Sequence, residues 1–179
     1  DKIETFTLDD RKIEKVSEEI EWNDEQAEKQ GFDTFMLKEI HEQPELIQKL
    51  KTIYQKGKDL ESLERIALEK PPFIHIAACG TALHAGLVIK NYFENKNNIR
   101  VQTDFASEFR YKTNSFRKGD VALFISQSGE TADTLACQEL CKSEGLPCFS
   151  IVNVEGSSLY RGCDVNFPIL AGKEVGVAS

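Results

Sequence analysis

The chain has 179 residues, of which 40% are hydrophobic and five are cysteines. This length suits one compact α/β domain with an extension and leaves little room for two full domains. A formal charge of −8 argues against nucleic acid or an anionic membrane surface as the main partner. The cysteine number is odd, and the sequence shows no CxxC spacing, no signal peptide and no apolar run of transmembrane length, which indicates a reducing cytoplasm.

Residues 1–30 are charged and only weakly patterned. The alternation in Ile3–Leu8 predicts an edge strand, which Asp9 and Asp10 would turn. We interpret the acidic remainder as a connecting arm, and a disordered leader stays open as the alternative. Because the sequence starts at Asp1 and ends in a stretch with loop character, we expect it to be part of a longer polypeptide.

Apolar residues at helical spacing predict a helix over residues 35–50. Pro44 is expected to open a second helix, because proline is favoured in the first helical turn. A further short helix is expected over residues 60–68, before the pair Pro71-Pro72. We expect these helices to pack against a sheet or a partner subunit.

Patterns of buried strands alternate with helical patterns over the rest of the chain. The expected strands are residues 73–78, 101–105, 121–125, 148–152 and 165–170, and the expected helices are residues 83–94, residues 107–110, one from about residue 130 and a short one from residue 157. This alternation predicts a three-layer α/β/α domain with a five-stranded parallel sheet, preceded by a helical arm. In the flavodoxin-like strand order 2-1-3-4-5, ligands bind where the first and third strands end.

Three hydroxyls follow the third predicted strand. Ser126, Ser128 and Thr131 surround Gly129, which lets the backbone approach a ligand closely. We expect Ser128 to be the N-cap of a helix from about Glu130, whose unpaired amides and positive dipole end would attract an anion. An ordinary capped turn is the alternative, because serine and threonine are enriched at helix starts for structural reasons alone.

The first predicted strand ends in a second turn of small residues, Cys79-Gly80-Thr81. The strand order brings this turn and the Ser126–Thr131 loop to the same crevice, which favours a phosphate site. The loop lacks the lysine of a Walker A motif, and no G-x-G-x-x-G is present. A single phosphate held by amides and hydroxyls therefore fits better than a triphosphate or a dinucleotide.

The histidines and Cys79 have structural interpretations. His84 lies one turn beyond Thr81, and we expect it to pack or to face water, with ligand contact as the alternative. His75, inside a buried strand, is interpreted as a hydrogen-bonded core residue, and His41 as a residue at a domain contact. Cys79 lies where a reactive thiol could be displayed, but no His-Asp pair is identifiable beside it, so close packing is the preferred interpretation.

The remaining candidates are two thiols and three charged residues. Cys137 and Cys141 are four residues apart on a predicted helix without a neighbouring histidine, which indicates packing rather than metal binding. Glu130 would compensate the helix dipole and is compatible with a bound phosphate only if it points away. Lys173 and Glu174 either approach the ligand or form a solvated pair in a loop. We expect no metal and no cofactor.

Five segments of the sequence carry a resemblance. They are Phe35–Pro44, Ala78–Thr81, Ala106–Tyr111, Ser126–Thr134 and Gly176–Ser179. In this order they resemble the sugar isomerase (SIS) part of the glutamine:fructose-6-phosphate aminotransferases, also called glucosamine-6-phosphate synthases. The Ser126–Thr131 loop alone would indicate only an SIS domain, whereas the set of five is specific for this family.

The resemblance implies an enzyme in which an N-terminal glutaminase supplies ammonia to two consecutive SIS domains, which convert fructose 6-phosphate into glucosamine 6-phosphate. It implies that residues 1–30 are a linker or the tail of the glutaminase domain, residues 31–72 the N-terminal helices of the isomerase part, and residues 73–179 a C-terminally truncated first SIS domain. The implied partners are fructose 6-phosphate or glucosamine 6-phosphate, a second copy in a homodimer, and covalently linked glutaminase and second SIS domains. The implied location is the cytoplasm.

The resemblance also implies roles for single residues. The sugar phosphate would be held by Thr81, Ser126, Gln127, Ser128 and Thr131. The sugar would be contacted by Cys79, Gly80, Val177 and Ser179. The family's catalytic residues belong to the second SIS domain, the C-terminal tail and the glutaminase, so the chain alone is expected to be inactive.

The sequence departs from the family pattern at Ala82, where the family usually has a serine. The missing hydroxyl predicts weaker phosphate binding unless backbone amides compensate. Two other functions stay open, namely a non-catalytic SIS module that senses a phosphosugar and a flavodoxin-like carrier of a flavin or nucleotide. Binding of fructose 6-phosphate, FMN and AMP measured in parallel distinguishes the carrier.

Overall fold

The computed structural model describes residues 4–6, 9, 11–13, 28–56, 73–112 and 115–176. Its elements in chain order are β1 (Thr5–Phe6), β2 (Lys12–Ile13), α1 (Phe35–Lys56), β3 (Phe73–Ala78), α3 (Gly80–Tyr92), the π-helix η2 (Phe93–Asn97), β4 (Arg100–Phe105), α4 (Ala106–Phe109), β5 (Val121–Ser126), α5 (Ala132–Ser143), β6 (Cys148–Val152), α6 (Ser158–Gly162) and β7 (Val165–Pro168).

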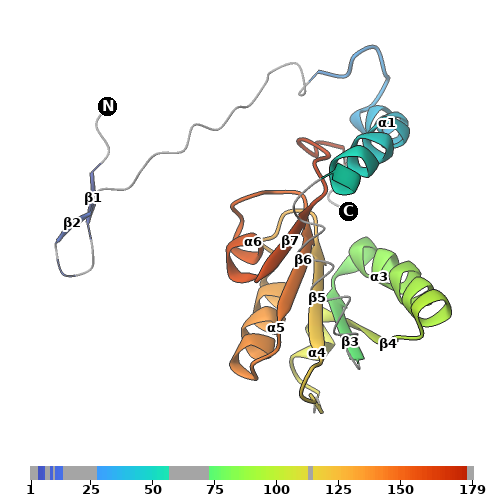
Figure 1. Cartoon of the computed structure of the whole chain (residues 1–179). Helices are drawn as coiled ribbons and strands as arrows, with labels where there is room; N and C mark the ends of the chain where they lie inside the picture. The colour runs from blue at the N-terminus through green and yellow to red at the C-terminus, as the bar shows by residue number, and fades with distance from the viewer. Residues whose placement is uncertain are drawn as a thin grey trace.

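Five parallel strands form the main sheet in the order β4-β3-β5-β6-β7. Numbered along the chain, these strands have the order 2-1-3-4-5, so the predicted fold class is confirmed. Helix α3 covers one face of the sheet, and α4, α5 and α6 cover the other (Figure 1). The sheet therefore lies between two helical layers, and the carboxyl ends of β3 and β5 meet at the switch point.

The central strands bury both of their faces, because successive side chains point to opposite sides of a sheet. Ile76 of β3 lies in the core next to α3, whereas Ala77 lies in the core on the other face. In β5, Leu123 and Ile125 belong to the first core and Phe124 to the second. All five are buried, which is why the strand sequences are continuous apolar runs.

The start of α5 differs from the prediction. The helix begins at Ala132 with Thr131 as its N-cap, so the expectation that Ser128 caps this helix is wrong. Gly129 has a φ of 68°, and this left-handed conformation keeps the loop non-helical beyond Glu130. Ser128 instead accepts a hydrogen bond within the loop, from the amide of Glu130 at 3.2 Å.

Helix α1 is one continuous helix with Pro44 inside it, so the expectation of a second helix opening at Pro44 is wrong. A proline removes a single intrahelical hydrogen bond, and the strong helix formers that follow it, such as Glu45 and Leu46, allow the helix to continue. The helix lies across one end of the sheet, outside the two helical layers (Figure 1). The hydroxyl of Tyr54 donates to the carbonyl of Pro168 at 2.6 Å, which ties the helix to the end of β7.

The apolar surface of α1 is only partly covered. Five large apolar side chains of this helix stay exposed, namely Met36, Leu37, Ile40, Ile47 and Ile53. His41 stacks on Phe32, with ring centroids 5.3 Å apart. The helix therefore presents an apolar face that the described residues do not cover.

The chain ends are described in part. Thr5 pairs with Ile13 in an antiparallel ladder between β1 and β2, which confirms the centre of the strand predicted over Ile3–Leu8. The helix predicted over residues 60–68 and the last three residues, 177–179, lie outside the described residues. Helix α3 begins earlier than predicted, at Gly80.

His75 is a buried core residue, as predicted. Its Nε2 lies 3.3 Å from Oδ2 of the buried Asp120, which directly precedes β5. The rings of Phe73, Phe109 and Phe116 surround the imidazole. Burial lowers the pKa of His75 and outweighs the opposing hydrogen bond and charge of Asp120, so the imidazole is neutral at neutral pH.

Candidate functional site

Two strand-to-helix turns meet at the carboxyl ends of β3 and β5. These strands are paired, and Ala78 at the end of β3 stands opposite Ile125 near the end of β5. Cys79 links β3 to α3, and residues 127–131 link β5 to α5. Parallel strands therefore bring together two turns that are far apart in the sequence.

The two turns enclose a cavity of about 370 Å³, which we call the loop cavity. Its lining residues are Cys79, Gly80, Thr81, Ala82, Ile125, Ser126, Gln127, Ser128, Thr131 and Glu174. Among the described residues that line this cavity there is no lysine, arginine or histidine, and Glu174 is the only charged one. These residues offer an anion hydroxyls and amides.

The hydroxyls organise the loop around themselves. Ser126 Oγ accepts from the amide of Gly129 at 3.0 Å and lies 3.5 Å from Oγ1 of Thr131. Ser128 Oγ accepts from the amide of Glu130 at 3.2 Å. In Ser126 and Ser128 these bonds use oxygen lone pairs, so each O–H can still be donated to a ligand.

Both helices that start at the loop cavity begin without a side-chain cap. The N-cap of α3 is Cys79 and that of α5 is Thr131, and neither side chain makes a capping hydrogen bond. The first amides of a helix have no partner within the helix, and they form the positive end of its dipole. Two such helix starts at one cavity favour an anion with several acceptor oxygens.

The loop is braced from α6, on the side away from the cavity. The carbonyl of Gly129 accepts from the amide of Leu159 at 3.0 Å, and Glu130 Oε1 accepts from the amide of Ser158 at 2.7 Å. A Cβ added to Gly129 would lie 2.1 Å from Oγ of Ser157, so the loop and α6 are in close contact. The bond to the Ser158 amide lowers the pKa of Glu130 and directs its charge away from the cavity.

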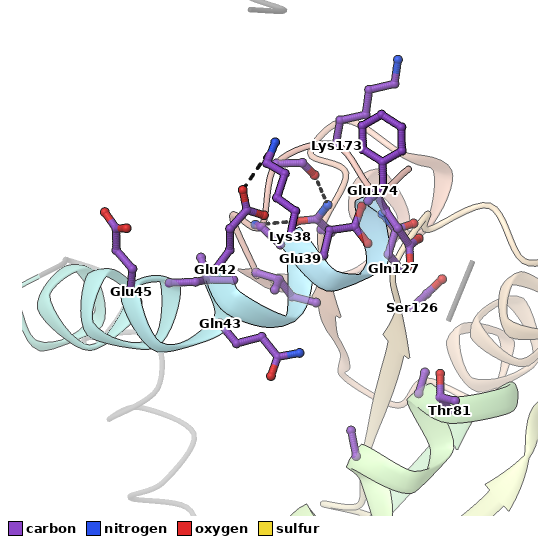
Figure 2. A pocket seen from close by; sticks show the side chains of 18 of the residues that line it. Lys38, Glu39, Glu42, Gln43, Glu45, Thr81, Ser126, Gln127, Lys173 and Glu174 are labelled. Atoms are coloured by element: carbon purple, nitrogen blue, oxygen red, sulfur yellow. Dashed lines mark hydrogen bonds and ion pairs between the residues drawn. The ribbon is translucent and has the colours of Figure 1, made fainter. Parts of the chain in front are cut away.

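A larger cavity of about 660 Å³, which we call the α1 cavity, adjoins the loop cavity. The two cavities share Thr81, Ala82, Ile125, Ser126, Gln127 and Glu174. Figure 2 shows Lys38, Glu39, Glu42 and Glu45 projecting from α1 on one side, and Thr81, Ser126 and Gln127 on the other. A ligand held in the loop cavity therefore has room to extend toward α1.

The structure brings together the residues predicted to hold a phosphate. All five predicted phosphate-binding residues line the loop cavity, namely Thr81, Ser126, Gln127, Ser128 and Thr131. Cys79 and Gly80, predicted to contact the sugar, line it as well. The other two predicted sugar contacts, Val177 and Ser179, lie outside the described residues.

Several charged and reactive candidates are now placed. His84 is exposed and is absent from the lining of both cavities, so its alternative role in ligand contact has no support. Lys173 lines the α1 cavity, and Glu174 lines both. Cys79 Sγ lies 3.9 Å from Oγ1 of Thr134, a contact that fits close packing.

Sequence reasoning missed Asn153, which directly follows β6 and lines the α1 cavity. Its backbone amide donates to the carbonyl of Gln127 at 3.2 Å, so Asn153 contacts the Ser126–Thr131 loop. Asn153 occupies the carboxyl end of a parallel strand, and this position was the signal that could have found it. Glu39 was missed as well, although it lies within the Phe35–Pro44 segment that carries the resemblance.

The two thiols considered as metal ligands are core residues. Cys137 and Cys141 are fully buried in the core cluster below α5. Cys137 Sγ donates to the carbonyl of Ala106 at 3.1 Å, and burial raises the pKa of Cys137 to about 12. Within the part of the chain that the structure describes, no group of three or more His, Cys, Asp or Glu side chains could hold a metal ion. Within the same residues, no helix has the length and apolar character needed to span a membrane.

Comparison with known families gives a match over most of the chain. The family model described as the SIS domain matches residues 67–179. The chain belongs to the SIS domain family. This match covers the sheet, both turns and the loop cavity, so the site lies within the family's domain.

Individual relatives carry a more specific name. The glutamine:fructose-6-phosphate aminotransferase (isomerizing) of Clostridium tetani is 43% identical over 184 residues, which cover 100% of this chain and 30% of that protein. A protein of the same name from Bradyrhizobium diazoefficiens is 47% identical over 161 residues, which cover 86% of this chain and 26% of that protein. This SIS-domain chain therefore spans about 30% of the length of the curated relatives it matches.

A solved structure agrees with these relatives. The C-terminal domain of glucosamine-fructose-6-phosphate aminotransferase from Francisella tularensis superposes with a TM-score of 0.77 at 37% identity. The superposition covers 85% of this chain and 44% of that one. The SIS chain thus shares its fold with one portion of that domain.

Proposed function

We propose that this chain is the fructose-6-phosphate-binding SIS domain of a glutamine:fructose-6-phosphate aminotransferase, which makes glucosamine 6-phosphate from fructose 6-phosphate and glutamine. The observation that carries the proposal is the loop cavity, where hydroxyls from two separate turns and two uncapped helix starts face one space. A phosphoryl group has acceptor oxygens for these donors. The names of the relatives support the choice of sugar phosphate.

In this proposal the phosphate is bound without a basic side chain. Its ligands are Thr81, Ser126, Gln127, Ser128 and Thr131, together with the amides at the starts of α3 and α5. Ala82 also lines the cavity and supplies no hydroxyl, so the amide of the α3 start takes a larger share of the binding.

The sugar part is proposed to extend from the loop cavity toward the α1 cavity, because the two adjoin. Cys79 and Gly80 form the floor beside the phosphate, and Val177 and Ser179 contact the sugar from the end of the chain. No residue of the chain is assigned a chemical step. The chain binds and orients the substrate, and we expect it to be inactive by itself. We expect this binding to require neither a metal nor a cofactor.

The proposal extends to the rest of the protein. Residues 1–30 are a linker or the tail of a glutaminase domain, residues 31–72 belong to the isomerase part, and residues 73–179 are the first of two SIS domains. The relatives' greater length supports the additional domains. We place the protein in the cytoplasm, with neither nucleic acid nor membrane as a partner.

A homodimer is part of the proposal. It is supported by exposed apolar side chains on two helices, such as Ile47 on α1 and Val88 on α3, which are 61% and 70% exposed. A monomeric mass for the intact protein in light scattering would contradict this part.

Ligand titration tests the binding function. We expect fructose 6-phosphate to saturate the chain in the micromolar to millimolar range of metabolite sites, whereas FMN, AMP and unphosphorylated fructose do not. Ser128→Ala should weaken fructose 6-phosphate binding by about 10-fold to 100-fold, because it removes one charge-assisted hydrogen bond. Isothermal titration calorimetry measures all of these affinities.

Ser143→Ala is the matched control, because Ser143 lies at the far end of α5 and donates to the carbonyl of Leu140 at 2.8 Å. Its affinity for fructose 6-phosphate should equal that of the parent. Unchanged binding in Ser128→Ala, or saturation by FMN instead, would contradict the proposed site. A phosphosugar sensor would show the same binding, and the names and length of the relatives support the enzyme over the sensor.

A further inference from the structure

The segment after β7, residues 169–176, forms a wall of both cavities without regular secondary structure. Glu174 of this segment lines the loop cavity and the α1 cavity. The backbone turns through left-handed conformations at Leu170, with a φ of 57°, and at Gly172, with a φ of 75°. The amide of Ile169 donates to the carbonyl of Val152. Beyond Ile169, hydrogen bonds between neighbouring strands no longer determine the course of the backbone. Side chains from other elements hold the segment instead.

Asn153 holds the first half of the segment. Its Oδ1 accepts from the amide of Ala171 at 2.8 Å, and its Nδ2 donates to the carbonyl of Gly172 at 2.7 Å. The same residue contacts the Ser126–Thr131 loop, which we call the phosphate loop after its proposed role, through the carbonyl of Gln127. This attachment belongs to the sheet and is independent of α1.

Glu39 of α1 holds the second half. Its Oε1 accepts from the amides of Val175 at 2.8 Å and of Gly176 at 2.9 Å. Bonds from amides to a carboxylate are charge-assisted and stronger than bonds between neutral groups. The fit is close, because a Cβ added to Gly176 would lie 2.7 Å from Oε2 of Glu39 and 2.8 Å from the amide nitrogen of Met36.

The neighbouring carboxylates of α1 have other surroundings. Glu42 pairs with Lys38 at 3.6 Å, within the same helix. Glu45 is exposed on the rim of the α1 cavity. Figure 2 shows these carboxylates along one side of the cavity, with Glu39 at the end where Glu174 lies.

We propose that Glu39 is a positioning residue for the sugar end of the site. By accepting the amides of Val175 and Gly176, its carboxylate keeps the segment in place, so that Glu174 faces the ligand beside the phosphate loop. The inference rests on the proposed function and deepens it. The phosphate end does not depend on Glu39, because α6 braces the loop through Gly129 and Glu130.

The test compares two ligands in the full chain and its Glu39→Ala, Glu39→Gln and Glu139→Ala variants. We expect Glu39→Ala to weaken fructose 6-phosphate binding by about 10-fold to 100-fold, and inorganic phosphate binding by less than about 2-fold. Glu39→Gln keeps an acceptor oxygen at the same place, so its loss should be smaller. Glu139→Ala removes the same charge from an exposed position of α5 that lines neither cavity, and should bind both ligands like the parent.

Hydrogen exchange reads the contact directly. The amides of Val175 and Gly176 should be protected in the parent and should exchange faster in Glu39→Ala, whereas the amide of Leu159 behind the phosphate loop should not change. Gly176→Ala disturbs the same contact from the opposite side, because its Cβ meets the backbone of Met36. It should reproduce the selective loss of fructose 6-phosphate binding.

The outcomes separate this inference from the proposed function. Unchanged fructose 6-phosphate binding in Glu39→Ala, equal losses for both ligands, or unchanged exchange at Val175 and Gly176 would overturn the positioning role alone. A parent chain that binds neither ligand would overturn both proposals. Selective loss in Glu39→Ala and Gly176→Ala, with Glu139→Ala like the parent, supports both.

Discussion

The two ends of the main sheet both carry polar side chains, but they use them differently. At the carboxyl ends of β3 and β5, hydroxyls surround the loop cavity, and Ser126 and Thr131 lie 3.5 Å apart beside open space. At the amino ends of the same strands, His75 and Asp120 lie 3.3 Å apart among aromatic rings. One polar pair faces a cavity, and the other is enclosed.

The difference lies in what surrounds each pair. Phe109 and Phe116 pack around His75, and the free atoms of the pair, Nδ1 of His75 and Oδ1 of Asp120, are buried without a hydrogen-bond partner among the residues described here. At the other end small lining residues such as Gly80 and Ala82 leave space for a ligand, and a Cβ added to Gly80 would meet nothing within 4 Å. Polar groups become a binding site where small neighbours keep them accessible, and a structural pair where rings exclude water.

The largest expected effect tests how closely the carboxyl end is braced. Gly129→Ala places a Cβ 2.1 Å from Oγ of Ser157 and 2.9 Å from Cγ2 of Val152, at a φ of 68°. Both the overlap and the strained backbone oppose the loop conformation, so the free energy of unfolding should fall by about 2 to 4 kcal/mol. Urea unfolding measures this, and fructose 6-phosphate titration should show lost binding.

Gly145→Ala separates backbone strain from overlap. Gly145 also has a positive φ, of 76°, but a Cβ there would meet nothing within 4 Å. Its free energy of unfolding should fall by only about 1 kcal/mol, with ligand binding intact. Equal losses in the two variants would show that the loop and α6 are not in the close contact described.

An intermediate effect is expected at the amino end, from the pH dependence of stability. Because the pKa of His75 is lowered in the folded state, the unfolded chain binds the proton more readily. The free energy of unfolding should therefore fall as the pH drops below the ordinary histidine value of 6.5, and level off below the folded pKa. His75→Gln keeps a donor for Asp120 but cannot titrate, so urea unfolding between pH 8 and about pH 5 should lose this component.

His84→Gln is the control, because His84 is exposed. Its dependence of stability on pH should match that of the parent. If His75→Gln and the parent show parallel curves over the same pH range, the enclosed pair at the amino end does not exclude the proton, and the comparison of the two ends fails.

The smallest effect is expected at Glu130, on the outside of the phosphate loop. Its pKa is lowered because its carboxylate accepts the amide of Ser158, so the ionised form stabilises the fold above the ordinary value of 4.5. This contribution is lost as the pH falls through the lowered pKa. Glu130→Gln should therefore be slightly less stable than the parent at pH 6, and this difference should shrink as the pH is lowered, as measured by urea unfolding.

Glu155→Gln is the matched control, because Glu155 is also exposed and precedes the same helix, α6. It should be as stable as the parent over the same pH range. A larger loss of stability in Glu155→Gln than in Glu130→Gln would show that the Glu130 carboxylate does not brace the loop.

The strands and the turns that follow β3 and β5 could be predicted because local patterns encode them. β3 and β6 have the predicted bounds, since apolar runs such as Phe73–Ala78 have few other ways to be buried. The strand order then brought Thr81 and Ser128 to one cavity. The start of α5 and the continuity of α1 were predicted wrongly, because each depends on how one residue, Gly129 or Pro44, is accommodated by its neighbours.

By itself the sequence determined the sheet, its order and the gathering of hydroxyls at the ends of two strands. The reason is that strand patterns, helical patterns and turn residues each act over a few positions of the chain. Only the tertiary structure decided that Glu39 receives the amides of Val175 and Gly176, that Asn153 joins the phosphate loop to the segment after β7, and that α1 closes a second cavity. The reason is physical. Packing decides which distant backbone groups are left unpaired beside a side chain, and these groups become its hydrogen-bond partners. No local sequence pattern records that outcome.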